Sequence, residues 1–346
     1  MSINKPIQLG LCCLNITLRN SKPSVFCSRG MIQRTINEPG GIEILKSKII
    51  ENCKDLIKMI EWNEQNGIKV FRISSSLFSH KTNPNIPNYD MEFAKDLLRT
   101  AGDLAKQYNQ RITMHPGQYN VVGTPHEKCF KQTILDLEYQ CTILDYMGMG
   151  VNSVMVVHGG GIYGDKEATK KRWCKQFYEL PENVQKRLVL ENCEKCFSIQ
   201  DCLDISKQIN IPVVLDTHHY NCYKLLHPEE NIKNIKDYIP DILNTWIIRN
   251  IKPKFHVSEQ GIGRCGHHSD YIDIIPDYLT EIPEIYDIHI DIMIEAKKKE
   301  LAIFKLYQKY TFLQCKIKKT KKIKIIKKNK KIILIKKNKK IFLIKK

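Results

Sequence analysis

Residues 187–219, RLVLENCEKCFSIQDCLDISKQINIPVVLDTHH, indicate most directly how the chain folds. Two apolar runs, RLVLENC (187–193) and IPVVLDTHH (211–219), lie on either side of a segment long enough for a helix. Continuous runs of Leu, Val and Ile are typical of strands in a parallel sheet, which is buried on both faces. Strand, helix and strand in this order predict one βαβ unit.

The same alternation extends from Gln8 to about Tyr310. The strand-like runs are QLGLCCLN (8–15), KVFRISS (69–75), RITMHP (111–116), SVMVVHG (153–159), RLVLENC (187–193), IPVVLDTHH (211–219), KPKFHVSE (252–259) and DIMIEAK (291–297). Helical patterns lie between them, as at 41–67, which ends in Gln-Asn-Gly, and at 91–109. Eight such units predict a closed (β/α)8 barrel. An open, doubly wound sheet is the alternative, because both folds use right-handed crossovers.

Composition excludes several classes of protein. With 346 residues, 42% of them hydrophobic and 27% charged, the chain can bury a large core, which excludes wholesale disorder. It has no stretch of about 18 apolar residues for a membrane span and no cleavable signal sequence, so we expect no membrane association and no secretion. Its 13 cysteines have no framework spacing. Reduced thiols in the cytoplasm or nucleus are the expectation.

The positive charge is concentrated in the C-terminal tail. Of the 55 Lys and Arg residues, 16 are lysines of residues 316–346, so that 39 basic residues face 37 acidic ones in the rest of the chain. We therefore divide the chain into a barrel domain, residues 1–310, and a flexible low-complexity tail, residues 311–346. Such a polycation attracts phosphate backbones or anionic membranes nonspecifically, or it is a dispensable extension.

Polar side chains occur where the predicted strands end. They are His115, His158, Glu191, Asp216, His219, His256, Glu295 and, in a following loop, His268. In this barrel the carboxyl ends of all strands meet at one face, where active sites lie. Imidazoles and carboxylates that converge there suit divalent cations such as Zn²⁺ or Mn²⁺. Two or three such ions would be needed for so many ligands, and clustered metals commonly serve phosphoester hydrolysis.

At these residues the sequence resembles the UV damage endonuclease family, which is related to the endonuclease IV-like metal-dependent barrels. The strings that carry the resemblance are LGLCCLNITL, FRISSSL, MHPGQYN, VVHGGGIYG, LENCE, PVVLDTHHY, PKFHVS, GHHSDYI and MIEAKKKE, in the family's order. The resemblance implies an ATP-independent repair enzyme that nicks DNA immediately 5′ to UV photoproducts (pyrimidine dimers and 6-4 photoproducts) by metal-activated water. The nick leaves a 3′-hydroxyl and a 5′-phosphate.

The resemblance also implies roles for individual residues. The metal ligands would be the eight strand-end residues above, and Glu191 would bridge metals as a catalytic group. Lys254 and Asn15 would lie beside the metals and the scissile phosphate, and Gln118 and Tyr119 would enter the duplex at the lesion. Two positions depart from the family pattern. Leu11 replaces an expected aromatic residue, and Asn83 stands where a further His ligand is expected, so that His80 is taken as the substitute ligand.

We expect two or three divalent ions, Mn²⁺ first, with Zn²⁺, Mg²⁺ or Co²⁺ as alternatives, and double-stranded DNA with UV lesions as the partner. A monomer without an obligate protein partner is the expected state. The alternatives are an apurinic/apyrimidinic endonuclease of the endonuclease IV class, a metal-dependent sugar isomerase and a noncatalytic DNA-binding protein. The string MHPGQY favours the UV damage endonuclease over the first of these.

Overall fold

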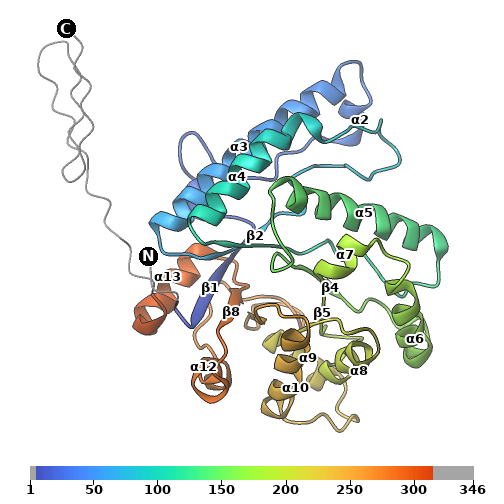
Figure 1. Ribbon diagram of the computed structural model, residues 1–346, viewed down its shortest axis with the longest axis vertical. Helices are drawn as coiled ribbons and strands as arrows, with labels where there is room; N and C mark the ends of the chain where they lie inside the picture. Colours follow the sequence, from blue (N-terminus) through green and yellow to red (C-terminus); the bar gives the residue numbers. More distant parts are fainter. Residues whose placement is uncertain (1–4, 315–346) are drawn as a thin grey trace, which may run out of the picture.

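The computed structural model describes residues 5–314, in which eight parallel strands form a nearly closed barrel surrounded by helices (Figure 1). The strands are β1 (Ile7–Cys12), β2 (Val70–Ile73), β3 (Arg111–Met114), β4 (Met155–His158), β5 (Leu188–Glu191), β6 (Val213–Val214), β7 (Lys254–Val257) and β8 (Ile290–Ile294). Their order is β6-β5-β4-β3-β2-β1-β8-β7. An Asp216–His256 bridge joins the ends of this series, and the His256 N–H donates to the Leu215 carbonyl (2.9 Å). This closure confirms the predicted (β/α)8 barrel and excludes the open sheet.

Helices follow the strands and cover the outside of the barrel (Figure 1). They are α1 (Ile16–Arg19), α2 (Gln33–Ile36), α3 (Gly41–Gln65), α4 (Lys95–Gln107), α5 (Glu127–Tyr146), α6 (Lys166–Phe177), α7 (Glu182–Arg187), α8 (Ile199–Ile209), α9 (Thr217–Leu226), α10 (Ile239–Ile248), α11 (Asp277–Thr280), α12 (Ile282–Tyr286) and α13 (Glu300–Lys309). Short 3-10 turns are η1 (Glu92–Ala94), η2 (Ile235–Tyr238) and η3 (Thr311–Leu313). The Gln-Asn-Gly signal does end α3, with Gly67 in the left-handed region (φ 71°).

The alternation of side chains along each strand decides which residues reach the inside of the barrel. In β8, Met293 lies in the interior, where the end of its side chain closely approaches Gly10 of β1: a Cβ on Gly10 would lie 2.8 Å from Met293 Cε. Below it, Asp291 pairs across the interior with Arg111 of β3 (2.8 Å). Glu295, two residues beyond Met293, therefore lies in the same interior at the carboxyl end of the strands. The same rule sets Lys254 and His256 on one side of β7, and both are fully buried.

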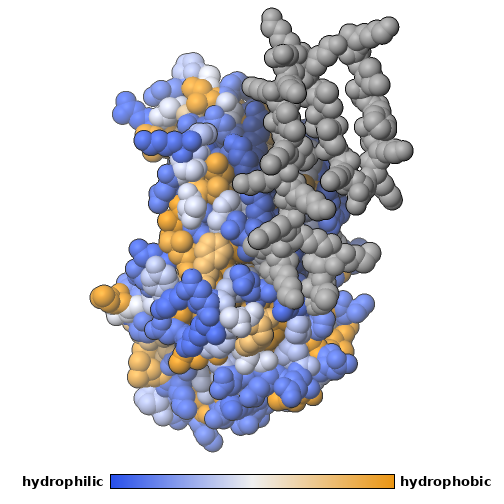
Figure 2. Space-filling view, turned by 90° about the vertical axis from the view of Figure 1, so that its left-hand side faces the viewer, coloured by the Kyte–Doolittle hydropathy of each residue, from blue (hydrophilic) through white to orange (hydrophobic). Residues whose placement is uncertain are grey.

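The outer surface contains both hydrophilic and hydrophobic residues. On the face in Figure 2, hydrophobic residues form small groups between larger hydrophilic areas. No helix within residues 5–314 is long and apolar enough to cross a membrane. The described chain ends just after η3, where Leu313 is buried in the core. The predicted Lys-rich tail lies, from residue 315 onward, outside the described residues, so the proposed division at residue 310 stays a prediction.

A candidate metal centre at the carboxyl end of the barrel

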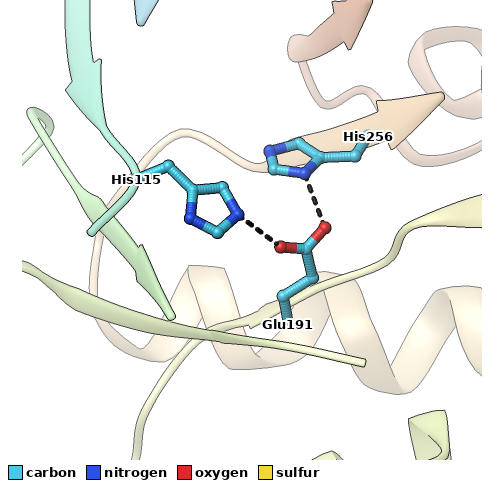
Figure 3. Close-up of side chains that lie close together, drawn as sticks. All are labelled: His115, Glu191 and His256. Atoms are coloured by element: carbon cyan, nitrogen blue, oxygen red, sulfur yellow. Dashed lines mark hydrogen bonds and ion pairs between the residues drawn. The ribbon is translucent and has the colours of Figure 1, made fainter. Parts of the chain in front are cut away.

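Glu191, the last residue of β5, is the centre of a buried polar cluster at the carboxyl end of the barrel (Figure 3). Its side chain is completely buried, and its two oxygens contact imidazoles from other strands. Oε2 lies 3.0 Å from Nε2 of His115, which follows β3, and Oε1 lies 2.6 Å from Nδ1 of His256 in β7. Residues far apart in the sequence thus meet at one point, as the barrel geometry predicts.

Two further imidazoles approach the same carboxylate. Nε2 of His158, at the end of β4, lies 3.6 Å from Oε2 of Glu191. Nδ1 of His219 lies 3.9 Å from Oε1, and the same nitrogen contacts the Asn192 carbonyl at 3.0 Å. In the neutral ring, donation from Nδ1 of His219 to that carbonyl leaves a lone pair on Nε2. A backbone partner on one ring nitrogen is the usual arrangement of a histidine that binds metal through the other.

Two more carboxylates extend the cluster. Glu295, directly after β8, lies 3.3 Å from Nδ1 of His256 through Oε1 and 3.9 Å from Nδ1 of His268 through Oε2. Asp216 has a ligand atom within 4.8 Å of the corresponding atoms of His256 and Glu295, and it forms a similar group with Glu191 and His219. All eight strand-end residues therefore belong to one continuous cluster.

The sequence interpretation of residues 211–219 as a strand was wrong in its second half. Strand β6 comprises only Val213–Val214, and His219 belongs to the first turn of α9. Asp216 begins this helix as its N-cap, because its Oδ1 accepts the backbone N–H groups of His218 and His219 (both 2.8 Å). Capping turns the chain sharply at the end of the strand, so that Asp216 and His219 both remain at the site.

Arg72 and Asn192 are site residues that sequence reasoning missed. Arg72 in β2 is largely buried and forms an ion pair with Glu295. Asn192 clamps the backbone of Asp216, since its Oδ1 accepts the N–H (2.9 Å) and its Nδ2 donates to the carbonyl (3.1 Å). The signal for Arg72 was a charged residue inside the apolar run KVFRISS, and for Asn192 an amide next to Glu191. Each of them contacts a candidate metal ligand: Arg72 pairs with the Glu295 side chain, and Asn192 holds the backbone of Asp216.

Several ionisable groups are buried together in the cluster, and their pKa values are shifted. Burial, together with the nearby carboxylate of Glu191, raises the pKa of Asp216 to about 6 against the opposing effect of His219. Burial alone would raise the pKa of Glu191, but the imidazoles of His256 and other neighbours hold it well below its usual value. Burial lowers the pKa of Lys254, which donates to Nε2 of His256, to about 8. Bound cations would relieve the repulsion among these carboxylates.

Unpaired buried atoms support a fit to metal ions. Within residues 5–314, Oδ2 of Asp216 and Nδ1 of His158 are buried without a hydrogen-bond partner. Such groups cost free energy unless a ligand satisfies them. The donor set, imidazole nitrogens with carboxylate oxygens, is the one that borderline divalent ions prefer. The residues present therefore fit a divalent metal site.

Three other predicted residues lie around this centre. Asn15, three residues beyond β1, is buried and caps α1 by accepting the Leu18 N–H (2.8 Å), while its Nδ2 has no partner within residues 5–314. Gln118 and Tyr119 form the tip of a turn after β3, and both are exposed, Tyr119 to 85%. Asn15 thus belongs to the interior and the pair to the outer rim.

His80 is not brought into the cluster. Its Nε2 contacts the Met31 carbonyl at 2.8 Å, and its Nδ1 accepts from Asn83 Nδ2 at 3.2 Å. His80 and Asn83 both line a separate cavity of 520 Å³ beside α5. No contact within residues 5–314 joins His80 to Glu191 or its neighbours, so its assignment as a ligand stays a prediction without structural support.

Comparison with known proteins decides the family of the chain. The family described as UV-endonuclease UvdE matches residues 7–329. The chain belongs to this family. It is 40% identical over 316 residues to a candidate UV-damage endonuclease of Acanthamoeba polyphaga mimivirus, covering 90% of this chain and 93% of that protein. It is 38% identical over 323 residues to the UV-damage endonuclease of Schizosaccharomyces pombe, covering 89% of this chain and 52% of that protein.

Solved structures agree with this membership. The crystal structure of SacUVDE superposes with a TM-score of 0.73 at 27% identity, covering 89% of this chain and all of that one. Endonuclease IV from Thermus thermophilus matches with a TM-score of 0.51 at 16% identity, over 75% of this chain and 94% of that one, which shows a shared fold alone. The family membership confirms the prediction of a UV-damage DNA endonuclease.

Proposed function

We propose that this UV-endonuclease family member nicks duplex DNA immediately 5′ to UV photoproducts, without ATP, and leaves a 3′-hydroxyl and a 5′-phosphate. The observation that carries the proposal is the buried cluster around Glu191, which lies where this barrel class has its active sites. Pyrimidine dimers and 6-4 photoproducts are the proposed lesions, and double-stranded DNA is the proposed partner. We further propose that the chain acts inside the cell as a monomer.

We also propose that the cluster holds two or three divalent cations, Mn²⁺ before Zn²⁺, Mg²⁺ or Co²⁺. The proposed ligands are His115, His158, Glu191, Asp216, His219, His256, His268 and Glu295. Cations at such a site supply an activated water and stabilise the oxygen that leaves phosphorus. The unpaired Oδ2 of Asp216 and the mutual repulsion of the buried carboxylates support this assignment.

The residues of the chain itself orient the reacting groups. Glu191 accepts from imidazoles on both sides, so its carboxylate is fixed at the middle of the cluster. Arg72 holds Glu295 in place through their ion pair. Lys254 donates to His256 from inside the barrel, and this contact turns Nδ1 of that ring toward the carboxylates. Asn15 has a buried amide N–H₂ group available for the scissile phosphate.

Lesion selectivity is proposed to depend on Gln118 and Tyr119. Straight B-DNA hides the phosphate beside a base pair from a site inside a barrel, so the duplex must bend and the damaged nucleotides must leave the stack. Damage weakens stacking and lowers this cost by a few kcal/mol. The exposed Tyr119 ring could then replace the lost stacking partner, and the Gln118 amide could bond the orphaned base edge.

The experiment compares Glu191→Gln with Glu182→Gln, a control on the outer helix α7, where Glu182 pairs only with Lys186 among residues 5–314. Loss of the central charge weakens the whole cation site. Mutation of a residue that only supports a metal ligand typically lowers metal affinity or activity about 10–100-fold. Glu191 is a proposed ligand itself, so we expect nicking by Glu191→Gln to fall by more than about a hundredfold. Binding to irradiated DNA should persist. Wild-type nicking by Glu191→Gln at limiting Mn²⁺ would disprove the assignment.

A further inference from the structure

The two most exposed large hydrophobic side chains of the described chain are Ile262, at 99%, and Tyr119, at 85%. Tyr119 is already part of the proposed lesion-reading pair, whereas Ile262 has no role in the function derived so far. An isoleucine so completely exposed leaves its whole apolar surface in water, which is unfavourable unless a partner covers it. Both residues belong to loops that leave the carboxyl ends of strands.

These two loops lie on opposite sides of the barrel opening. Gln118 and Tyr119 follow β3, and Ile262 follows β7, which in the closed ring is four strands away from β3 in either direction. The metal-ligand candidates lie between them, because His115 precedes the first loop and His256 precedes the second. A duplex laid across the site would therefore meet an exposed apolar side chain on each side.

The β7 loop is a compact hairpin whose tip is held in place. Gln260 bridges to His268, and the Gly261 N–H donates to the His267 carbonyl at 2.6 Å. The Gln260 side chain also donates to the carbonyl of Arg264 at 3.1 Å. A Cβ at Gly261 would lie 2.2 Å from the His268 carbonyl oxygen, so only glycine permits this close approach. The tip is thus preorganised, which lowers the entropic cost of binding.

The hairpin also ties its tip to the candidate metal centre. Its stem contains His268, which lies 3.9 Å from Glu295. Ile262 is two residues from the stem residue Gln260, a reach of about 7 Å along an extended chain. Arg264 at the same tip is exposed and forms no ion pair within residues 5–314. An apolar side chain and an available guanidinium are therefore presented together beside the site.

We propose that Ile262 and Arg264 form a second DNA-contacting element, which grips the duplex on the side opposite Gln118 and Tyr119. Ile262 packs against a base step or deoxyribose from the minor groove, and Arg264 pairs with a backbone phosphate. Apolar wedges with neighbouring cations are the usual means by which proteins bend DNA at the minor groove. The inference rests on the proposed function, because it needs bent duplex DNA as the partner.

The test uses the full chain with Ile262→Ser, and Ile262→Leu as the conservative variant. Ile285→Ser is the matched control, since Ile285 is also exposed (62%) but lies on α12, at the amino end of the following strand. Affinity is measured with chelator present, on a duplex with one photoproduct and 2-aminopurine in the base pair beside it. We expect Ile262→Ser to weaken binding about tenfold, through loss of buried apolar surface, and to reduce the fluorescence rise on binding, while Ile262→Leu and Ile285→Ser resemble wild type.

Arg264→Gln tests the second half of the element. Removal of one phosphate contact should reduce the slope of log affinity against log salt by about 0.9. Metal content and melting temperature are measured for every variant, because His268 shares the hairpin; they should be unchanged. The inference is wrong if Ile262→Ser binds, unstacks and nicks like wild type, or if only its metal content changes. If wild type itself leaves the irradiated duplex intact, the proposed function fails first, and this inference fails with it.

Discussion

The Asn120 side chain holds the turn that carries Gln118 and Tyr119 in place. Its replacement should weaken discrimination between damaged and undamaged DNA without unfolding the barrel. Its side chain is 6% exposed, and Nδ2 donates to the Gly117 carbonyl at 3.0 Å and to Oδ2 of Asp136 at 2.7 Å. Asp136 belongs to α5, which packs on the barrel, so this amide connects the turn to a rigid element. The change we consider is Asn120→Ala.

The size of the effect follows from the two bonds that are lost. A hydrogen bond to a carbonyl contributes about 0.5–1.5 kcal/mol, and one to a carboxylate about 1.5–3 kcal/mol. The backbone bond from the Asn120 N–H to the Gly117 carbonyl remains, so the turn is loosened rather than destroyed. If about 1.4 kcal/mol of this loss acts on the position of the turn, discrimination between damaged and undamaged DNA falls about tenfold.

The assay is the ratio of nicking rates on duplexes with and without a photoproduct, together with hydrogen exchange of residues 117–121. Asn120→Ala should lower the ratio about tenfold and speed exchange in this segment, with unchanged metal content. Asn152→Ala is the control, because that amide accepts the Lys252 N–H at the opposite end of the barrel. An unchanged ratio in Asn120→Ala, despite faster exchange, would refute the idea that the turn must be held in place.

Three further predictions concern other residues. The double variant Gln118→Ala/Tyr119→Ala should lower the same ratio at least about tenfold at constant metal content, since the stacking partner is lost; equal ratios would place damage sensing elsewhere. Arg72→Met should lower the free energy of unfolding of metal-free protein by about 3–5 kcal/mol in urea titrations, because it removes the guanidinium partner of the buried Glu295 carboxylate; a loss below about 1 kcal/mol would contradict this. A hydrogen bond from Cys193 lowers the pKa of Cys196 to about 6 against the effect of burial. The alkylation rate of Cys196 should therefore stop rising above about pH 7 in the wild type, and only at higher pH in Cys193→Ala. Identical pH profiles of the two proteins would contradict the hydrogen bond.

The local part of the site could be predicted from the sequence. A polar residue that ends an apolar run, such as His158 after MVV or Glu191 after LVL, is visible within a few residues. The parallel topology then brings such residues to one face whatever their distance along the chain. The sequence prediction missed that the second half of VVLDTHH is helical. Asp216 acts as an N-cap, and its side-chain hydrogen bonds to the backbone compete with strand formation over only a few residues.

The remaining features depend on contacts between distant segments. The ion pair of Arg72 with Glu295 joins residues 223 positions apart, so no local pattern reveals that this arginine points into the site. The His80 ring contacts the carbonyl of Met31, which lies 49 positions away in the sequence, so no local pattern reveals where this ring points. The exposure of Ile262 results from a hairpin closed between Gln260 and His268, and an isoleucine in sequence alone suggests burial.

Mapping the cut on one duplex shows whether the chain makes a metal-dependent nick directed by UV damage. A labelled duplex with a single pyrimidine dimer is incubated with the full chain and Mn²⁺, with and without chelator, beside matched abasic and undamaged duplexes. We expect one cut, at the phosphodiester immediately 5′ to the dimer, with a 3′-hydroxyl that a polymerase extends without further treatment and with no product under chelator. Cutting of the abasic duplex alone, or equal cutting with chelator present, would contradict this expectation.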